Sequence, residues 1–172
     1  MIWLTPIRFL VEALTAESSS RQIALGFALG LIVGLVPKGN LLAIALVMVL
    51  YCLRVNLAAG LLSAILFSWV GVLTDPLTHQ VGLWLLSVDA LQPMWTQLYD
   101  LPLAPWTAFN NTVVLGSLVL GVVAFYPVYR LSVPVADRVA PAVRERMQRL
   151  RIVRLIWGLE LAGGIAGGSS GT

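Results

Sequence analysis

Four apolar stretches with short polar breaks between them dominate the hydrophobic pattern of the chain. They cover residues 21–36, 41–53, 57–73 and 112–129, and Arg21 is the one charged residue inside them. The last two hold about 17 residues each, close to the roughly 20 apolar residues that a helix needs to cross a hydrocarbon core. The pattern therefore predicts an all-α integral membrane protein, a small helical bundle with spans at 57–73 and 112–129.

The first two apolar stretches are short for spanning helices. At about 1.5 Å per residue they reach roughly 22 and 20 Å, against a hydrocarbon core of about 30 Å. Pro37-Lys38-Gly39-Asn40 separates them, and Arg21 and Arg54 stand at their far ends. Two arrangements fit: a hairpin of short spanning helices, or a broken, re-entrant pair over 21–53 that dips into the membrane and returns. The shortness favours the re-entrant pair, whose irregular backbone must be surrounded by protein or by a wet cavity.

A separate amphipathic unit precedes the first apolar stretch. Residues 1–16 place apolar side chains at helical spacing, with Arg8 and Glu12 on another side. This predicts a short interfacial helix that lies on the membrane or packs along the bundle. Ser19 and Gln22 then have the spacing of a capping box, so a transmembrane domain over 20–130 is expected to begin with a new helix there.

The segment 75–111 has a different composition. It contains three aspartates and no Lys or Arg, and it is rich in tryptophan and proline, which is typical of an outer interfacial segment. Asp75-Pro76 is a good helix start with Asp as the N-cap, so the preceding span is expected to end at 73. Short amphipathic helices are expected at 79–87 and 94–99.

Arginine density sets the predicted orientation. Seven of the 11 basic residues follow the last span directly, which places the C-terminus, and by counting back the N-terminus, in the cytoplasm. The predicted membrane-surface basic residues are Arg138, Arg144, Arg146, Arg149, Arg151 and Arg154. Residues 131–162 are predicted to form a cytoplasmic basic amphipathic tail that lies on anionic lipid or docks on its own bundle. Residues 163–172 hold five glycines and are predicted to be a flexible tail or the remnant of an expression tag.

Composition agrees with a membrane location. Of the 172 residues, 59% are hydrophobic and 11% are charged, and the mean hydropathy is +0.90, whereas soluble domains carry about 25% charge. An ordinary soluble domain, a disordered protein and a disulfide scaffold are excluded. The net charge of +3 is explained by arginines that orient the spans, so no nucleic-acid partner is expected. Cys52 lies in an apolar stretch and is predicted to be a buried, unreactive thiol.

Small residues recur every fourth position on two of the predicted helices. They are Gly26, Gly30 and Gly34 on the first helix, and Gly60, Ala64 and Ser68 on the third. Such spacing lets neighbouring backbones approach closely. We expect helix packing within one chain; a contact with a second copy or with a partner is the alternative.

Two interruptions of the apolar pattern carry polar residues that a ligand or lipid could meet. The candidates are Pro37, Lys38, Gly39 and Asn40 at the first interruption, and Asn110 and Asn111 at the second. Broken helices in corresponding places often mark a transport site, and a lysine at depth is costly and tends to be functional. The alternative is structural: Lys38 satisfies carbonyl groups at a tight turn, and the asparagines cap helices.

Catalytic chemistry has little support in the sequence. Asp75 and His79 are four residues apart and could touch on a helix, but no nucleophile motif accompanies them. We predict a structural role for them at the outer interface, together with Trp84, Trp95 and Trp106. No catalytic residue, no metal site and no cofactor is predicted, and the protein is not expected to be an enzyme.

Several of these motifs resemble those of a family of small bacterial inner-membrane proteins of unknown function. The resemblance rests on Ser20–Asn40 (SRQIALGFALGLIVGLVPKGN), Leu53–Asn56 (LRVN), Phe67–Trp69 (FSW), Asp75–His79 (DPLTH), Leu91–Pro93 (LQP) and Phe109–Gly116 (FNNTVVLG). It covers about 20–130. The family has no agreed catalytic residues, so none are carried over. Members of this subgroup are thought to be encoded beside a large envelope protein that looks like the AsmA-type lipid-transport bridges.

The function expected from this resemblance is that of a non-enzymatic, multi-pass inner-membrane subunit of a phospholipid transport complex. Its partners would be membrane lipids and a large AsmA-like periplasmic protein, or a second copy of the chain. The alternative is an autonomous small oligomeric transporter or lipid scramblase, with a site near Lys38.

Overall fold

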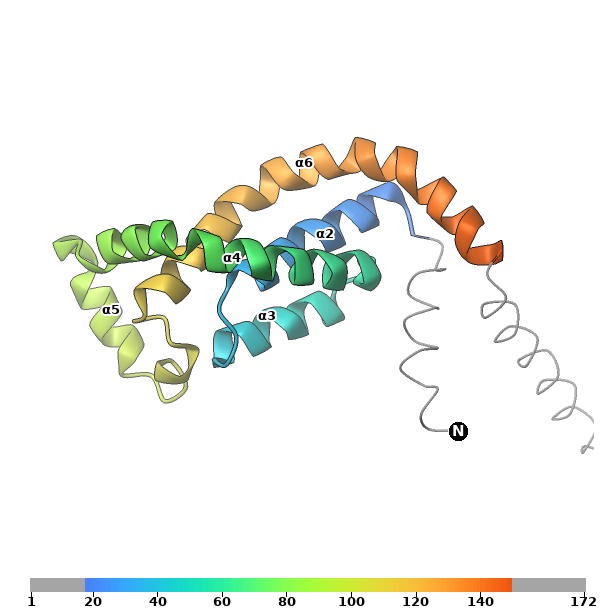
Figure 1. The fold of residues 1–172 in the computed structure, drawn as a ribbon. Coiled ribbons are helices and arrows are strands. Elements are labelled where there is room, and N and C mark those ends of the chain that lie inside the picture. The colour runs from blue at the N-terminus through green and yellow to red at the C-terminus, as the bar shows by residue number, and fades with distance from the viewer. Residues whose placement is uncertain (1–17, 150–172) are drawn as a thin grey trace, which may run out of the picture.

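The computed structural model describes residues 18–149, and every regular element in that range is helical (Figure 1). The helices are α2 (Ser20–Leu35), α3 (Leu41–Cys52), α4 (Leu57–Leu86), η2 (Asp89–Leu91), α5 (Gln92–Tyr99), η3 (Pro105–Thr107) and α6 (Thr112–Arg149). The predicted interfacial helix at 1–16, the tail beyond 149 and the segment 163–172 lie outside the described residues. Side chains at 143, 144 and 146–149 are also outside the description.

Side-chain caps start the first three long helices. Ser19 and Gln22 form the predicted capping box at the start of α2. Asn40 accepts a hydrogen bond from the backbone N–H of Ala43 (2.8 Å) and so begins α3. Asn56 does the same for α4 through Ala59 (2.8 Å). These caps satisfy backbone donors that would otherwise be orphaned at helix ends, which is why the polar breaks divide the apolar pattern into these helices.

The structure differs from the sequence expectation at Asp75-Pro76. The predicted break is absent: α4 runs without interruption for 30 residues, Pro76 lies inside it, and Asp75 is not an N-cap. Hydroxyl groups stabilise this turn, because Thr74 donates to the carbonyls of Val70 and Gly71 and Thr78 donates to that of Asp75. The helix predicted at 79–87 is therefore the second half of α4, and the segment outside the long helices is 87–111 rather than 75–111.

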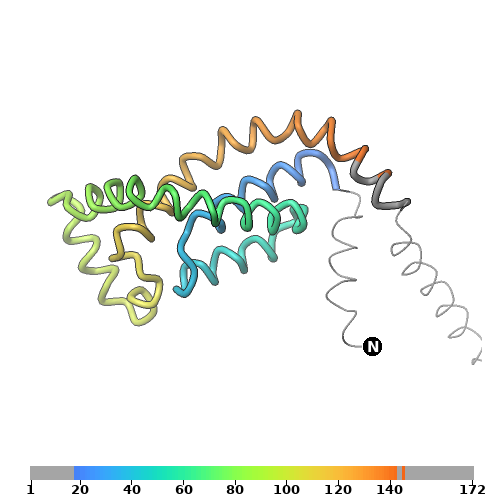
Figure 2. Tube along the Cα trace, viewed as in Figure 1, coloured from blue at the N-terminus to red at the C-terminus, as the bar shows by residue number. Residues whose placement is uncertain are grey.

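The predicted boundary between the last span and the tail is also absent. α6 continues for 38 residues through Pro127, Pro134 and Pro141, so the span at 112–129 and the described part of the tail are one helix. Figure 2 shows it as a single arch over α2. The described part of the basic tail, residues 131–149, is thus the second half of α6 and not a separate helix.

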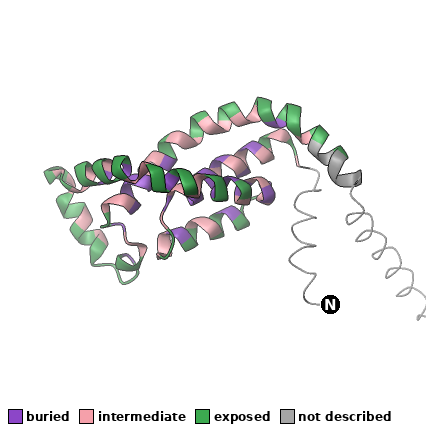
Figure 3. Ribbon diagram, in the orientation of Figure 1, coloured by how far each residue is buried: buried purple, intermediate pink, exposed green. Residues whose placement is uncertain are grey.

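The predicted small-residue stripes meet where α2 packs on α4. A Cβ atom at Gly26 would collide with the backbone carbonyl of Asn56, and one at Gly30 would collide with that of Gly60. At Gly34 the nearest atom would be the Cβ of Phe67, 2.6 Å away. Glycine is required here because the two backbones approach too closely for any side chain. In Figure 3 the buried residues gather along α2, where α4 and α6 enclose it.

A second glycine contact pairs α4 with α6. A Cβ at Gly82 would strike the backbone of Thr112, and one at Gly116 would strike the backbone of Thr78. The start of α6 therefore lies beside the last third of α4. α2 ends beside the middle of α4, because Leu35 faces Gly71, the fifteenth of the 30 residues of α4. The α2–α3 hairpin consequently reaches only about halfway along α4, as Figure 1 also shows.

Most of the apolar surface of the long helices is uncovered. Leu57–Leu86 and Thr112–Ala142 are long and apolar enough to cross a membrane, yet only 28% of the most apolar window of each is buried. Trp69 and Leu73 on α4 are 75% and 81% exposed. A core helix of a soluble protein would be covered, so this surface is typical of a membrane protein.

The helix α3 is apolar on all sides and lies at the edge of the bundle. Ala43 and Leu50 are its buried residues, whereas Ile44 and Met48 are exposed. Cys52, at its end, is exposed as well, which corrects the expectation of a buried thiol. The apolar pattern alone misplaced Cys52, because an apolar stretch in a membrane bundle faces outward as readily as inward.

Candidate functional site

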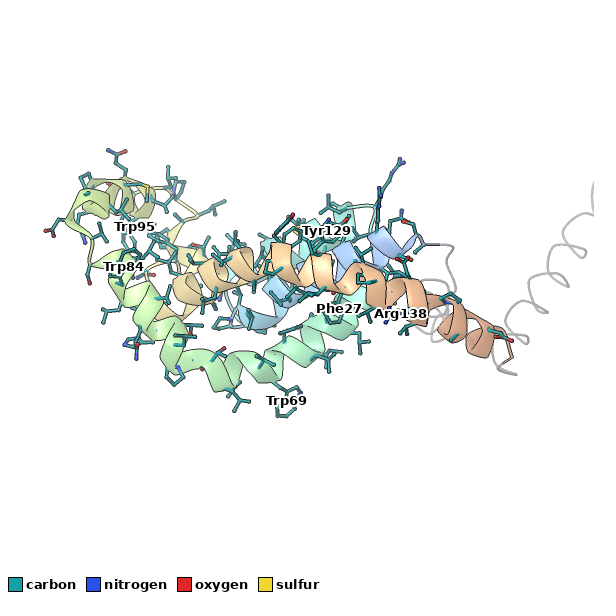
Figure 4. The ribbon with its side chains drawn as sticks, turned by 90° about the horizontal axis from the view of Figure 1, so that it is seen from above. Phe27, Trp69, Trp84, Trp95, Tyr129 and Arg138 are labelled. Carbon is teal, nitrogen blue, oxygen red and sulfur yellow. The ribbon has the colours of Figure 1, made fainter. Side chains whose placement is uncertain are left out.

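A large cavity opens between the first half of α4, α2 and the second half of α6. Its volume is about 760 Å³. Ile23 and Phe27 contribute from α2, Ile65 and Phe67 from α4, and Val135 from α6. Figure 4 shows Phe27 beside the stretch of α6 that carries Arg138. We refer to this cavity as the cleft.

Hydrocarbon lines nearly all of the cleft. Asn56 and Ser132 are its polar residues, and the rest are Ala, Val, Leu, Ile and Phe. The side chain of Asn56 is engaged in bonds with Ala59 and with the hydroxyl of Ser18. Phe27 and Phe67 meet edge to face, with ring centroids 6.0 Å apart. A polar ligand would lose its hydration here without replacement bonds, whereas a hydrocarbon chain would not.

Two arginines are close in sequence to residues that line the cleft. On α6, the exposed Arg138 stands between two pairs of lining residues, Val135–Ala136 and Val139–Ala140. On α2, the exposed Arg21 comes two residues before Ile23. The exposed Asp137 precedes Arg138, so these three residues leave one net positive charge next to the lining residues in the chain. Apolar lining and positive charge are the features that suit the acyl chains and the headgroup of an anionic lipid.

The cleft was not predicted from the sequence. Its walls come from residues 23–27, 56–67 and 128–140. The linear pattern assigns them to the first short apolar stretch, to the span at 57–73, and to the end of the last span together with the cytoplasmic tail. Only the continuation of α6 beyond the predicted boundary brings its second half over α2. A continuous helical period across residues 125–140 is the signal that would have indicated it.

The structure gives Lys38 a structural role. Its ammonium group donates hydrogen bonds to the carbonyls of Val33 (2.7 Å), Gly34 (2.9 Å) and Val36 (2.8 Å). These are the carbonyls left unpaired at the end of α2, where a positive charge also favours the helix dipole. The side chain turns back on its own helix, as the structural alternative predicts.

The other polar residues of the two interruptions cap helices or form the turn. Asn40 caps α3 and donates to the carbonyl of Pro37 (2.8 Å), and Gly39 has the positive φ of 94° that the turn requires. Asn111 accepts from the backbone N–H groups of Val113 (2.9 Å) and Val114 (3.3 Å). Asn110 is exposed.

The two interruptions do lie together, but their contact is apolar. Val36 and Ala43, on either side of the first interruption, pack with Val114 at the start of α6. Ala108, from the second interruption, packs against the same cluster. The contact therefore joins the hairpin tip to the start of α6 without forming a polar pocket.

The candidate pair Asp75 and His79 lies where α4 crosses α6. His79 Nδ1 is 2.6 Å from the hydroxyl of Thr112, so its hydrogen bond joins the two helices rather than reaching back to Asp75. Within residues 18–149, no three His, Cys, Asp or Glu side chains are grouped to hold a metal ion.

The predicted outer-interface tryptophans differ in their surroundings. Trp95 stacks on Phe109 with centroids 6.0 Å apart and donates to the carbonyl of Leu85 (3.3 Å), so it holds the segment 87–111 together. Trp84 is 69% exposed and Trp106 is 73% exposed. Trp106 belongs to the segment 87–111, where a partner can reach it, whereas Trp84 belongs to α4.

Only one of the predicted membrane-surface arginines is placed with its side chain. Arg138 is exposed on α6. Arg144, Arg146 and Arg149 lie on the same helix, but their side chains are outside the description, as are Arg151 and Arg154 altogether.

The fold and cleft define a class: a small, all-helical membrane-type bundle built on two long apolar helices. Residues 7–141 match the model of a family described as "Uncharacterized protein conserved in bacteria (DUF2062)", and the chain belongs to that family. An "Uncharacterized protein" of Treponema pallidum (strain Nichols) is 33% identical over 123 residues, which cover 72% of this chain and 76% of the relative. No solved structure matches the chain.

Proposed function

We propose that this protein is a non-enzymatic inner-membrane subunit that binds a phospholipid by an acyl chain in the cleft. The cleft is the observation that carries the proposal. Its volume of about 760 Å³ lies within the roughly 300–1,000 Å³ of small-molecule sites, and its lining is hydrocarbon. Arg138 and Arg21 provide positive charge for an anionic headgroup.

The membrane arrangement that we propose has α4 and α6 crossing the bilayer with the arginine-rich ends in the cytoplasm. The α2–α3 hairpin is then re-entrant, because its tip stops level with Gly71, the midpoint of α4. The cleft opens near the cytoplasmic end, where Arg54 and Arg138 lie. A lipid would enter it from the cytoplasmic leaflet.

The proposed partner is a large AsmA-like periplasmic protein, as the family resemblance implies. The reachable surface for it is the segment 87–111, where Trp106 is exposed. We expect Trp106→Ala to weaken co-purification of the partner several-fold, while Trp84→Ala, which removes an exposed tryptophan on α4, serves as the matched control. Unchanged partner recovery with Trp106→Ala would argue against this docking surface.

The test of lipid binding uses a phospholipid that carries a photoreactive group near the end of an acyl chain. Membrane vesicles that contain the full chain are irradiated, and the adducts are located by mass spectrometry. We expect adducts to concentrate on the cleft residues of 58–67 and 128–140. Equal labelling of the exposed faces of α3 and α4 would mean that lipid only surrounds the protein, and would overturn the proposal.

A further inference from the structure

The cleft is open on one side in the described part of the chain. Leu62 and Ile65 on α4, and Leu131, Val135 and Val139 on α6, line the cleft and are nonetheless exposed. Leu131 is 70% exposed. Two apolar rims thus face each other, and no described helix bridges them.

The chain preceding α2 arrives at this opening. Asn56, which lines the cleft, donates to the hydroxyl of Ser18 (3.1 Å), and its backbone N–H donates to the carbonyl of Gln22 (3.1 Å). These bonds and the Ser19–Gln22 capping box fix the point where residues 1–17 join the bundle. That point is at one end of the cleft.

The sequence of this segment suits an apolar groove. Ile7, Leu10 and Leu14 follow helical spacing on one side, with Arg8 and Glu12 on another. As a helix, 17 residues would reach about 25 Å. The rim on α6, from Val128 to Ala140, has a length of about 18 Å at the same rise per residue. The segment is therefore long enough to cover the opening.

The family match distinguishes this segment from the other end of the chain. The matched region begins at residue 7, inside the N-terminal segment, and ends at residue 141, before most of the basic tail. A cover that belongs to the domain is therefore expected among residues 7–17. The chain beyond α6 carries Arg151 and Arg154, and placing these charges against a hydrocarbon opening would be unfavourable.

We infer that residues 1–17 dock across the cleft with the apolar side of Ile7, Leu10 and Leu14 on its two rims. This docking decides between the two locations that the amphipathic pattern of the segment leaves open, on the membrane or along the bundle. The docking does not depend on the proposed lipid function.

Disulfide trapping in membrane vesicles tests the docking. In a Cys52→Ser background, which removes the single native cysteine, Val135→Cys is paired in turn with Ile7→Cys, Leu10→Cys and Leu14→Cys. The matched controls pair Val135→Cys with Arg8→Cys and with Glu12→Cys, on the opposite side of the segment. After mild oxidation, intrachain disulfides are quantified by mass spectrometry.

We expect at least one apolar-side pair to form the intrachain disulfide at least fivefold more than either control. Equal or absent intrachain bonding for all five pairs would place the segment elsewhere and overturn the inference. Disulfides that form only between two chains would assign the cover to a second copy and would also overturn it. Each of these outcomes is independent of whether a lipid is bound.

Discussion

Polar side chains in the apolar part of this chain act mainly on helix ends. Lys38 holds three carbonyls of α2, and Asn40, Asn56 and Asn111 begin three helices. In the hydrocarbon core, water is not available to satisfy backbone groups at helix ends, and each group left without a partner costs several kcal/mol. The caps avoid this cost. At the residue scale, these polar side chains therefore satisfy backbone groups where helices begin and end.

Removal of the Lys38 cap should destabilise the protein. We expect Lys38→Met to lower the free energy of unfolding by about 1–2 kcal/mol, because three hydrogen bonds to the end of α2 are lost. Arg54→Met removes an exposed basic residue at the end of the neighbouring helix and is the control. Thermal unfolding in detergent measures the stability of both variants. If Lys38→Met instead lost lipid binding without a change in stability, Lys38 would face a ligand.

Close glycine contacts provide a second residue-scale prediction. Gly30→Ala should be strongly destabilising, since the new Cβ would overlap the backbone carbonyl of Gly60, which cannot move without displacing α4. Gly121→Ala is the matched control: its Cβ would stand 3.3 Å from Ile32, and alanine gains about 1 kcal/mol in helix propensity. Melting temperatures should therefore fall by many degrees for Gly30→Ala and change little for Gly121→Ala. Similar values for the two variants would contradict the packing.

At the scale of elements, the chain consists of two long helices and a short hairpin inserted between them. The caps predicted α2 and α3 from sequence, because Ser19, Pro37 and Asn40 are strong local signals. The full lengths of α4 and α6 were not predicted, because Asp75-Pro76 is also a strong local signal for a boundary and the last apolar stretch ends at Arg130. The close contact of Thr78 with Gly116 lies two residues from Pro76 and supports the unbroken α4 at that point.

At the element scale, we predict that the tip of the α2–α3 hairpin lies within the membrane. In a Cys52→Ser background, Pro37→Cys should resist a membrane-impermeant maleimide added to either side of sealed vesicles. Arg54→Cys and Ala90→Cys, both at exposed positions, should react from the cytoplasmic and the outer side respectively. Labelling of Pro37→Cys from outside at the rate of Ala90→Cys would mean that α2 and α3 cross the membrane and are not re-entrant.

At the scale of the whole molecule, α6 arches over α2, and the cleft lies between these two helices and the first half of α4. Its walls are distant in sequence, and each wall alone is an ordinary apolar helix face, so the helical period across residues 125–140 is the one sign of the cleft in the linear pattern. The apolar stretches did predict an all-helical protein, and composition predicted its apolar exterior, because mean hydropathy does not depend on which residues meet. The candidate site expected near Lys38 was assigned from its polarity, whereas the cavity that the fold forms is almost wholly apolar.

The most direct measurement of the central claim is the amount of phospholipid that stays with the purified chain when the cleft is filled. Ala140→Trp places an indole in the cleft at a half-buried position, while Ala45→Trp makes the same substitution on an exposed face of α3. Native mass spectrometry of each variant in mild detergent counts the bound lipids per chain. We predict that Ala140→Trp loses one tightly bound phospholipid that the wild type and Ala45→Trp retain. Equal lipid counts in all three proteins, with Ala140→Trp still folded, would contradict the assignment of the cleft as a lipid site.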